Sequence, residues 1–374
     1  MYYKYFILVI PVLILFNSCN KHESSVNSDN TETRNFRLGF TPFPYDVTSA
    51  AVEYSYNKIK DEADIISHHF DDGVPWQEAY DGTEFHPNII SDWQYRLAQT
   101  PVSHKIFLSV TPINFERNGL AAYKGESTNM SLFPPWDTIS FNDPLVKTAY
   151  TNYCLRIAEF FNPDYFCIGI EVNLLMDSDP VIWDQYFELH SYVYDQLKSE
   201  YPDMKIFVTL TGMDLVDGYT YADHDNQIRA FNEIINYSDM YALSLHTFLS
   251  VFLADTIPAD MFDKIFSISD KPICIAETSY PAEIFSIFSE TIVFNGSESK
   301  QTDFFSLLFS ASEKYKAEFI INFVIRDYDN LWKAIGSPDD ITKVWKDTGF
   351  FDENGNEREV ITLWRDYLSK NPLN

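Results

Sequence analysis

Cysteine is scarce in this chain, and the short motifs that mark several common enzyme classes are missing. The sequence contains 4 cysteines in 374 residues. It has no glycine-rich phosphate-binding loop, no Gly-X-Ser-X-Gly turn around a nucleophilic serine, and no zinc-type spacing of cysteine and histidine. These absences argue against phosphate-loop, serine-nucleophile and zinc chemistry.

Basic residues are also few. Lys and Arg number 27 against 55 Asp and Glu, which gives a net charge of -28 and a pI of about 4.5. Such a surface repels polyanions, so nucleic acids and acidic polysaccharides are poor candidate partners. A neutral ligand is unaffected by the charge. The simpler alternative is that the acidity serves only solubility.

Only one long apolar run occurs, at the amino terminus. Lys4 precedes the stretch 6–16, which is apolar throughout with Pro11 inside it and is too short to span a membrane comfortably. Asn17, Ser18 and Cys19 follow it. This order resembles the lipobox of bacterial lipoproteins, which implies cleavage before Cys19 and lipidation of its thiol. A simple signal peptide with an incidental cysteine is the alternative.

The chain therefore divides into three parts. Residues 1–18 form the expected lipoprotein signal peptide. Residues 19–35 form a flexible polar tether, because Val26 is the only aliphatic residue among 20–34 and such a segment cannot bury enough surface to fold. Residues 36–374 form one folded domain. We expect a lipid-anchored protein of the bacterial cell envelope, facing the periplasm or the cell surface, with the outer membrane as one candidate. The cysteines beyond Cys19 are odd in number and cannot all pair in disulfides: Cys154, Cys167 and Cys274.

The folded domain alternates short apolar segments with longer amphipathic, helical stretches. This alternation is typical of repeated βα units around a parallel sheet, and the length suffices for a barrel of roughly 250 residues or more. We predict a single (β/α)8 barrel domain, of the α/β class. Its eight strands are 37–42, 64–69, 105–111, 165–171, 205–211, 240–246, 272–277 and 317–325. The long segments 70–84, 112–140 and 326–349, which follow the second, third and eighth strands, are expected to build a substrate cleft.

Two glutamates close predicted strands. Glu171 ends the fourth strand and Glu277 ends the seventh. Burying an unpaired glutamate costs several kcal/mol, so each must lie at an open mouth or be hydrogen-bonded. The carboxyl ends of barrel strands carry catalytic groups, and two facing carboxyl groups cleave glycosidic bonds. Strand alternation predicts that Glu171 faces the same side as Cys167 and that Ile170 faces the helices. An ion-paired structural role for each glutamate is the alternative.

The segments around both glutamates resemble a known family. Residues 275–281, Ile-Ala-Glu-Thr-Ser-Tyr-Pro, are similar to the E-T-x-Y-P nucleophile strand of glycoside hydrolase family 53, the endo-β-1,4-galactanases of clan A. Residues 168–173 resemble that family's G-N-E-I/V-x-N. The resemblance implies a retaining, endo-acting hydrolase of a neutral β-linked polysaccharide. Glu277 would be the nucleophile and Glu171 the acid/base, with carboxyl groups roughly 5–5.5 Å apart.

The sequence departs from this pattern in two places. Ile170 stands where the clan has an asparagine that binds the sugar 2-hydroxyl, and segment 68–76 lacks the family's arginines. The first departure favours an alternative, a non-catalytic glycan-binding lipoprotein. Retention of both Glu171 and Glu277 argues against it, because a binding protein needs neither.

Further residues are candidates for contacts with sugar. His68, His69, Asp71 and Asp72 could bind a metal, which leaves a metal-dependent hydrolase as a third reading, but ligands in one tight loop seldom converge. We predict neither a metal nor another cofactor, and assign His69 and Asp71 to sugar hydroxyls. His246 lies where clan A barrels often hold a ring that orients the nucleophile; a core histidine is the alternative. The remaining predicted substrate-binding residues are Trp76, Asn173, Tyr280 and Trp332. The expected partners are a poly- or oligosaccharide and, through Cys19, a membrane, but not nucleic acid.

Overall fold

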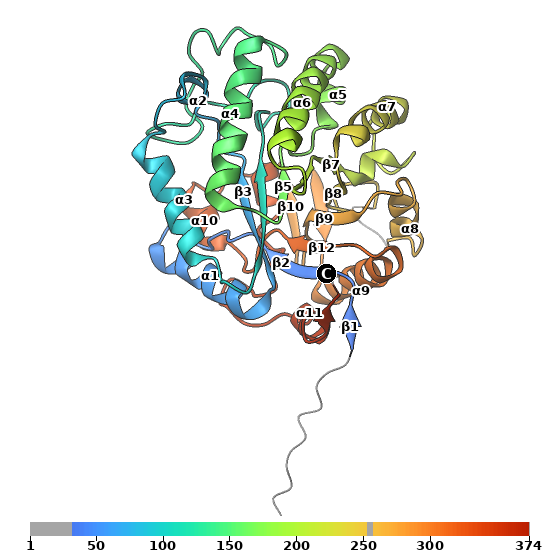
Figure 1. The fold of residues 1–374 in the computed structure, drawn as a ribbon. Helices are drawn as coiled ribbons and strands as arrows, with labels where there is room; N and C mark the ends of the chain where they lie inside the picture. Colours follow the sequence, from blue (N-terminus) through green and yellow to red (C-terminus); the bar gives the residue numbers. More distant parts are fainter. Residues whose placement is uncertain (1–31, 253–256, 374) are drawn as a thin grey trace, which may run out of the picture.

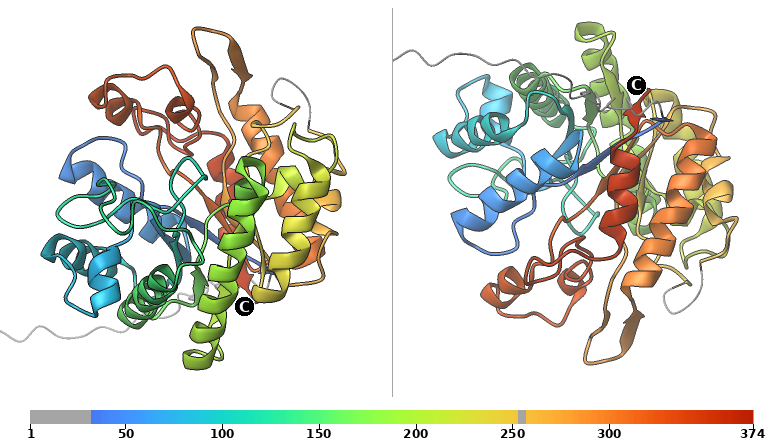
Figure 2. Two further views of the ribbon diagram at one scale, coloured as in Figure 1. Left: turned by 90° about the horizontal axis from the view of Figure 1, so that it is seen from above. Right: turned by 90° about the horizontal axis from the view of Figure 1, so that it is seen from below.

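The structure, a computed structural model, describes residues 32–252 and 257–373. A parallel sheet curls into a barrel, and helices surround it (Figures 1 and 2). The predicted signal peptide, Cys19 and most of the predicted tether lie outside the described residues.

The barrel strands match the prediction closely. They are β2 (Arg37–Phe40), β3 (Ile65–Phe70), β4 (Lys105–Val110), β5 (Tyr165–Cys167), β6 (Lys205–Phe207), β7 (Thr209–Thr211), β8 (Tyr241–Leu245), β9 (Ile273–Thr278) and β12 (Phe319–Asn322). Their order in the sheet is β6-β5-β4-β3-β2-β12-β9-β8-β7, and the pairings are parallel. β6 and β7 are the two halves of the predicted fifth strand, interrupted at Val208, so the chain itself closes the ring there. The predicted (β/α)8 fold is confirmed.

The helices lie outside the ring. They are α1 (Ser49–Glu62), α2 (Trp76–Asp81), α3 (Pro87–Gln99), α4 (Pro144–Phe161), α5 (Leu174–Ser178), α6 (Pro180–Glu200), α7 (His224–Ile234), α8 (Met261–Phe266), α9 (Glu298–Tyr315), α10 (Asp329–Ala334) and α11 (Val360–Leu368), with short 3-10 turns at Gly212–Leu215, Ile235–Tyr237 and Ile341–Lys343. Asp143 caps α4, because its Oδ1 accepts a hydrogen bond of 2.8 Å from the Leu145 N–H. In the described part of the chain, no helix is both long and apolar enough to cross a membrane.

Two small sheets lie apart from the barrel. The hairpin of β10 (Ile284–Ile287) and β11 (Ile292–Asn295) projects from the rim (Figure 2). β1 (Thr33–Arg34) pairs in parallel with β13 (Asn371–Pro372). Thr33 and Arg34 had been assigned to the flexible tether, and for these two residues the prediction was wrong. Arg34 is 2% exposed, and its guanidinium lies 2.6 Å from the carboxylate of Asp64, which fixes the chain at this point.

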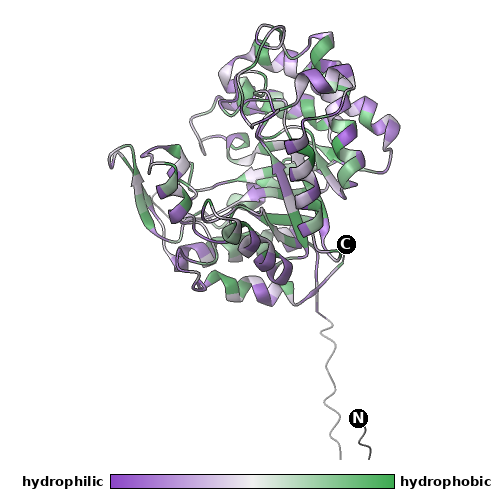
Figure 3. Ribbon diagram, turned by 90° about the vertical axis from the view of Figure 1, so that its left-hand side faces the viewer, coloured by the Kyte–Doolittle hydropathy of each residue, from purple (hydrophilic) through white to green (hydrophobic). Residues whose placement is uncertain are grey.

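The core has two layers. The larger fills the space between the sheet and the helices, whose outward turns are largely polar (Figure 3). The smaller fills the barrel itself, where Phe107 packs against Phe207 and Phe319 with ring centroids 5.8 and 5.0 Å apart. Cys167 and Cys274 are free and buried in this inner layer. These aromatic rings fill the inside of the barrel, so the side chains at the carboxyl ends of the strands meet above them.

Candidate active site

Glu171 and Glu277 line one cavity of about 130 Å³ at the carboxyl ends of the barrel strands. We call it the central cavity. His69 of β3 and Asp71, just after that strand, contribute to the same wall, as does Arg117 from the loop after β4. Its other lining residues are Phe115, Ile170, Phe323 and Trp345. The barrel therefore brings together four of the residues that the sequence had singled out.

Glu171 is held in an unusual backbone conformation. Its φ of 49° lies in the left-handed region, which costs roughly 1–2 kcal/mol for a residue with a side chain. The surroundings fix it there: its N–H donates to Thr209 Oγ1 at 2.8 Å. Its carboxylate accepts hydrogen bonds from Ser244 Oγ at 2.8 Å and from Arg117 Nη2 at 3.2 Å. Strained positions that are held so firmly cluster at functional sites.

Ile170 does not face the helices, so that prediction was wrong. It is 4% exposed, belongs to the inner layer of the barrel and lines the central cavity. β5 ends at Cys167, and a bend over 168–170 breaks the strand alternation on which the prediction rested. Gly169 lies in this bend and leaves room for Tyr186, because a Cβ there would lie 2.3 Å from the Tyr186 hydroxyl.

Glu277 is supported by a histidine. His246 Nε2 lies 3.1 Å from Glu277 Oε1, and its Nδ1 lies 2.9 Å from Ser279 Oγ. His69 Nδ1 is 3.9 Å from the other carboxylate oxygen. Burial acts to raise the pKa of Glu277, but the hydrogen bond from His246 and the charges of His246, His69 and Arg117 outweigh it and hold this pKa below its usual range. Glu277 is therefore a carboxylate at neutral pH, which is the form a nucleophile needs.

Arg117 is a functional candidate that the sequence analysis missed. One of its nitrogens, Nη2, lies 3.1 Å from Asp71 Oδ2 and 3.2 Å from Glu171 Oε2, so it joins the two carboxylates. The side chain is 11% exposed. It belongs to no motif, but it is the only arginine of segment 112–140, which had been expected to build the cleft. Arg117 and Lys124 are the two basic residues of that segment, and a lone guanidinium there was the available signal.

Two of the predicted aromatic contacts are part of the core instead. Trp76 is fully buried; its indole N–H donates to the Ala121 carbonyl at 2.8 Å, and its ring stacks on Trp136 at 5.8 Å. Tyr280 is 5% exposed and stacks on Phe304 at 5.2 Å. Both residues lie near strand ends as predicted, but their rings are packed in the core and are not accessible to a ligand.

Asn173 and Trp332 also lie away from the central cavity. Asn173 is fully buried, where its amide nitrogen donates to Thr211 Oγ1 and to Gln227 Oε1, each at 2.7 Å. It ties the start of α5 to β7 and α7, so it does not replace the missing clan asparagine. Trp332 is half-buried, and its indole N–H donates to the Pro338 carbonyl at 3.1 Å.

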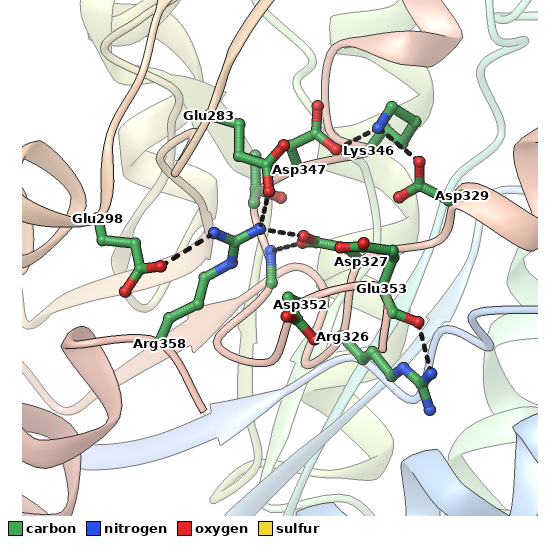
Figure 4. Close-up of polar contacts among 12 residues, drawn as sticks. Glu283, Glu298, Arg326, Asp327, Asp329, Lys346, Asp347, Asp352, Glu353 and Arg358 are labelled. Carbon is green, nitrogen blue, oxygen red and sulfur yellow. Dashed lines mark hydrogen bonds and ion pairs between the residues drawn. The ribbon is translucent and has the colours of Figure 1, made fainter. Parts of the chain in front are cut away.

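The four residues of the metal hypothesis do not converge. His68 is fully buried with Nε2 2.8 Å from Thr100 Oγ1, and burial lowers its pKa to about 3. Asp72 is paired with Lys124 at 2.7 Å. Within the described ranges, the one acidic group close enough to share an ion is Glu283, Asp327 and Glu353. Arg358 donates to two of these carboxylates, Glu283 and Asp327, so a guanidinium already neutralises them (Figure 4).

Comparison with known proteins identifies the fold. No family model matches the chain, and no curated protein matches its sequence. Among solved structures, the exo-β-1,4-mannosidase Op5Man5 from Opitutaceae bacterium strain TAV5 has a TM-score of 0.62 at 12% identity, over 92% of this chain and 61% of that one. A GH5_18 protein from Bifidobacterium longum subsp. longum ATCC 55813, solved with Manb1-4GlcNAc, has a TM-score of 0.64 at 11% identity, over 91% and 80%. Fungal β-1,4-galactanases score 0.53 at 14% identity, over 84% and 91%. The chain thus has the barrel fold of glycoside hydrolases and spans 61% of the mannosidase's length.

Proposed function

We propose that this protein is a retaining glycoside hydrolase that cleaves a neutral β-linked saccharide, with Glu277 as nucleophile and Glu171 as acid/base. One observation carries the proposal: carboxylates from the fourth and seventh barrel strands line a single cavity at the carboxyl end of the barrel. The fold shared with known mannosidases and galactanases supports it.

The reaction runs in two steps. In the first, a Glu277 oxygen forms a bond to the anomeric carbon while the bond to the leaving oxygen breaks, and Glu171 gives that oxygen its proton. In the second, Glu171 takes a proton from water, the water oxygen bonds to the anomeric carbon, and the bond to Glu277 breaks. His246 keeps Glu277 ionised and oriented for the attack in the first step, and Ser244 and Arg117 orient Glu171.

The first substrates to test are β-1,4-linked mannans and galactans. Structural neighbours named for these activities share the barrel fold, and the motif around Glu277 resembles that of the galactanases. Endo action is the mode that this resemblance implies. A neutral substrate also suits a protein with a net charge of -28.

A second candidate function is glycan binding without cleavage. Ile170 favours it, because this apolar side chain lines the central cavity beside Glu171, where it offers no hydrogen bond to a sugar hydroxyl. The two functions differ in one measurement: a binding protein would hold a glycan tightly and release no product.

The test is hydrolysis of a panel of neutral β-glycans by the mature domain, beside Glu277→Ala, Glu171→Ala and a surface control, Glu84→Ala. Cleavage that both site variants abolish and the control retains would support the assignment and identify the substrate. A mechanism-based fluoroglycoside that labels Glu277, detected by peptide mass spectrometry, would identify the nucleophile directly. Full activity in Glu277→Ala would refute the assignment.

We also propose that lipid on Cys19 anchors the protein to the bacterial cell envelope. Its support is the lipobox-like order of an apolar run, Ser18 and Cys19. Metabolic labelling with a radioactive fatty acid should mark the wild-type chain in a bacterial host and leave Cys19→Ser unlabelled. Equal labelling of both chains would contradict the proposal.

A further inference from the structure

A second cavity of about 210 Å³ adjoins the central cavity. We call it the side cavity. Asp71 and Phe115 line both cavities and so form the partition between them. Phe115 is 61% exposed, although it borders both cavities. An exposed ring at such a place can stack on the apolar face of a ligand without any rearrangement.

The walls of the side cavity belong to the fold. Its lining comes from the loops after β3 and β4, which are hydrogen-bonded to each other. Val74 N–H donates to the Ala122 carbonyl at 2.9 Å, and Asn129 N–H donates to the Asp72 carbonyl at 3.0 Å. Gly73 has a φ of 107°, and a Cβ there would lie 2.8 Å from the Ala122 oxygen. The close approach of the two loops therefore requires glycine, and the cavity is formed before any ligand arrives.

The polar residues that line the side cavity carry carboxylates and amides. Asp71 and Glu116 bear the carboxylates, and Asn114 and Asn129 bear the amides. Among the contacts of the described residues, neither Glu116 nor the Asn129 amide has a side-chain partner. The described lining contains no Lys or Arg. Carboxylates accept hydrogen bonds from sugar hydroxyls, whereas an acidic sugar would meet the like charge of Glu116, for which the described residues show no cationic partner.

We propose that the side cavity is a second sugar subsite, selective for a neutral unit that stacks on Phe115 and bonds to Glu116 and Asn129. This rests on the proposed hydrolase function and extends it. The substrate is an oligo- or polysaccharide that spans both cavities. A monoglycoside with a small aryl leaving group occupies the central cavity alone.

The experiment compares kcat/KM for β-1,4-manno- and galacto-oligosaccharides, from disaccharide to pentasaccharide, with kcat/KM for the corresponding 4-nitrophenyl monoglycosides. Asn129→Gly and Glu116→Ala each remove a polar side chain that lines the side cavity but not the central cavity. Glycine is chosen because Asn129 has a φ of 52°, which glycine adopts without strain. Both variants should lower kcat/KM for the oligosaccharides roughly fivefold to tenfold and leave the monoglycoside unchanged.

Phe115→Ala should lower kcat/KM for the oligosaccharides by a similar factor. The matched control is Phe133→Ala. Phe133 is 37% exposed and belongs to the same loop, but it lines neither cavity. The control should leave both classes of substrate unchanged. An oligouronate of the same length should bind at least tenfold more weakly than the neutral oligosaccharide.

Calorimetric binding to Glu277→Gln separates the two proposals. Affinity that rises from monosaccharide to oligosaccharide, without any cleavage by the wild type, would support the subsite and overturn the hydrolase. Hydrolysis that is equal in wild type, Asn129→Gly and Phe115→Ala would support the hydrolase and overturn the subsite. Equal affinity for the oligouronate would overturn its selectivity, and a protein that neither binds nor cleaves any of these probes would overturn both.

Discussion

His246 Nε2 lies 3.1 Å from Glu277 Oε1, and this contact sets the ionisation of the candidate nucleophile. His246 stands on the strand next to Glu277 in the barrel, directly after β8, so the distance is fixed by sheet register rather than by a flexible loop. Besides burial, four interactions act on the pKa of Glu277 and all lower it. Two of them, a hydrogen bond and a charge, come from His246.

His246→Phe should therefore raise the pKa of Glu277. Burial raises this pKa, and the variant lacks the hydrogen bond and the charge of His246 that lower it. Below its pKa Glu277 is protonated and cannot attack, so the acid limb of kcat/KM should move to higher pH. At neutral pH, loss of a hydrogen bond to a charged group of about 1.5–3 kcal/mol should lower kcat/KM roughly tenfold to a hundredfold. The measurement is the pH profile on the best glycan of the panel. An acid limb that does not move would exclude His246 from this role.

Arg117→Met should cost both stability and activity. It leaves the carboxylates of Asp71 and Glu171 facing each other without their shared cation, and breaking such a largely buried pair costs about 3 kcal/mol. Urea unfolding measures the stability and kcat/KM measures the activity. Lys124→Met is the matched control, since Lys124 is a buried cation of the same loop that pairs with Asp72 away from the central cavity. It should lose stability and keep kcat/KM; a similar loss of kcat/KM in both variants would show that Arg117 acts only through folding.

Ile170→Asn should restore a polar group beside Glu171 and raise kcat/KM on glycans with a free 2-hydroxyl, since such a contact strengthens in the transition state. The same change places an amide in the apolar interior of the barrel, so the free energy of unfolding should fall by about 1–3 kcal/mol. Ile170→Val is the control and should lose about 1 kcal/mol with no gain in activity. Unchanged kcat/KM in the asparagine variant would mean that the 2-hydroxyl lies elsewhere.

Acid should destabilise the fold through two buried histidines. Burial lowers the pKa of His68 to about 3 and that of His190 to about 4, against 6.5 for an exposed ring. Between these values and pH 6.5 the unfolded chain binds protons that the native state does not, so stability falls as pH falls through this window. His190→Gln should remove on the order of 3 kcal/mol of this dependence. The readout is Tm against pH in the wild type and in His190→Gln, and an equal dependence on pH in the two chains would contradict the prediction.

The fold was readable from the sequence because the strands are marked by composition. All eight predicted strands occur, since apolar runs buried on both faces leave little ambiguity about strand position. The helix after Asp143 begins where its capping residue and Pro144 predicted. Even the interruption at Val208 falls inside a predicted strand and does not change the order of the ring.

The site was only partly readable. Glu171, Glu277, His69 and Asp71 meet as expected, because the carboxyl ends of parallel strands converge. The orientation of Ile170 was not predictable, since the bend after Cys167 depends on contacts with β6 and β7. Trp76 and Tyr280 failed for a related reason: a ring near a strand end can face a cleft or the core, and only the packed neighbours decide which.

The pairing of β1 with β13 determines which end of the barrel faces a surface attached near these strands. β1 and β13 pair with each other just before β2 begins (Figure 1). Since the barrel strands are parallel and Glu277 lies at the carboxyl end of β9, the pair lies at the end of the barrel opposite Glu171 and Glu277. A support attached at residue 32 or residue 373 thus faces the end of the barrel away from the central cavity. Immobilisation at either position should leave the central cavity turned outward and open to a long glycan chain.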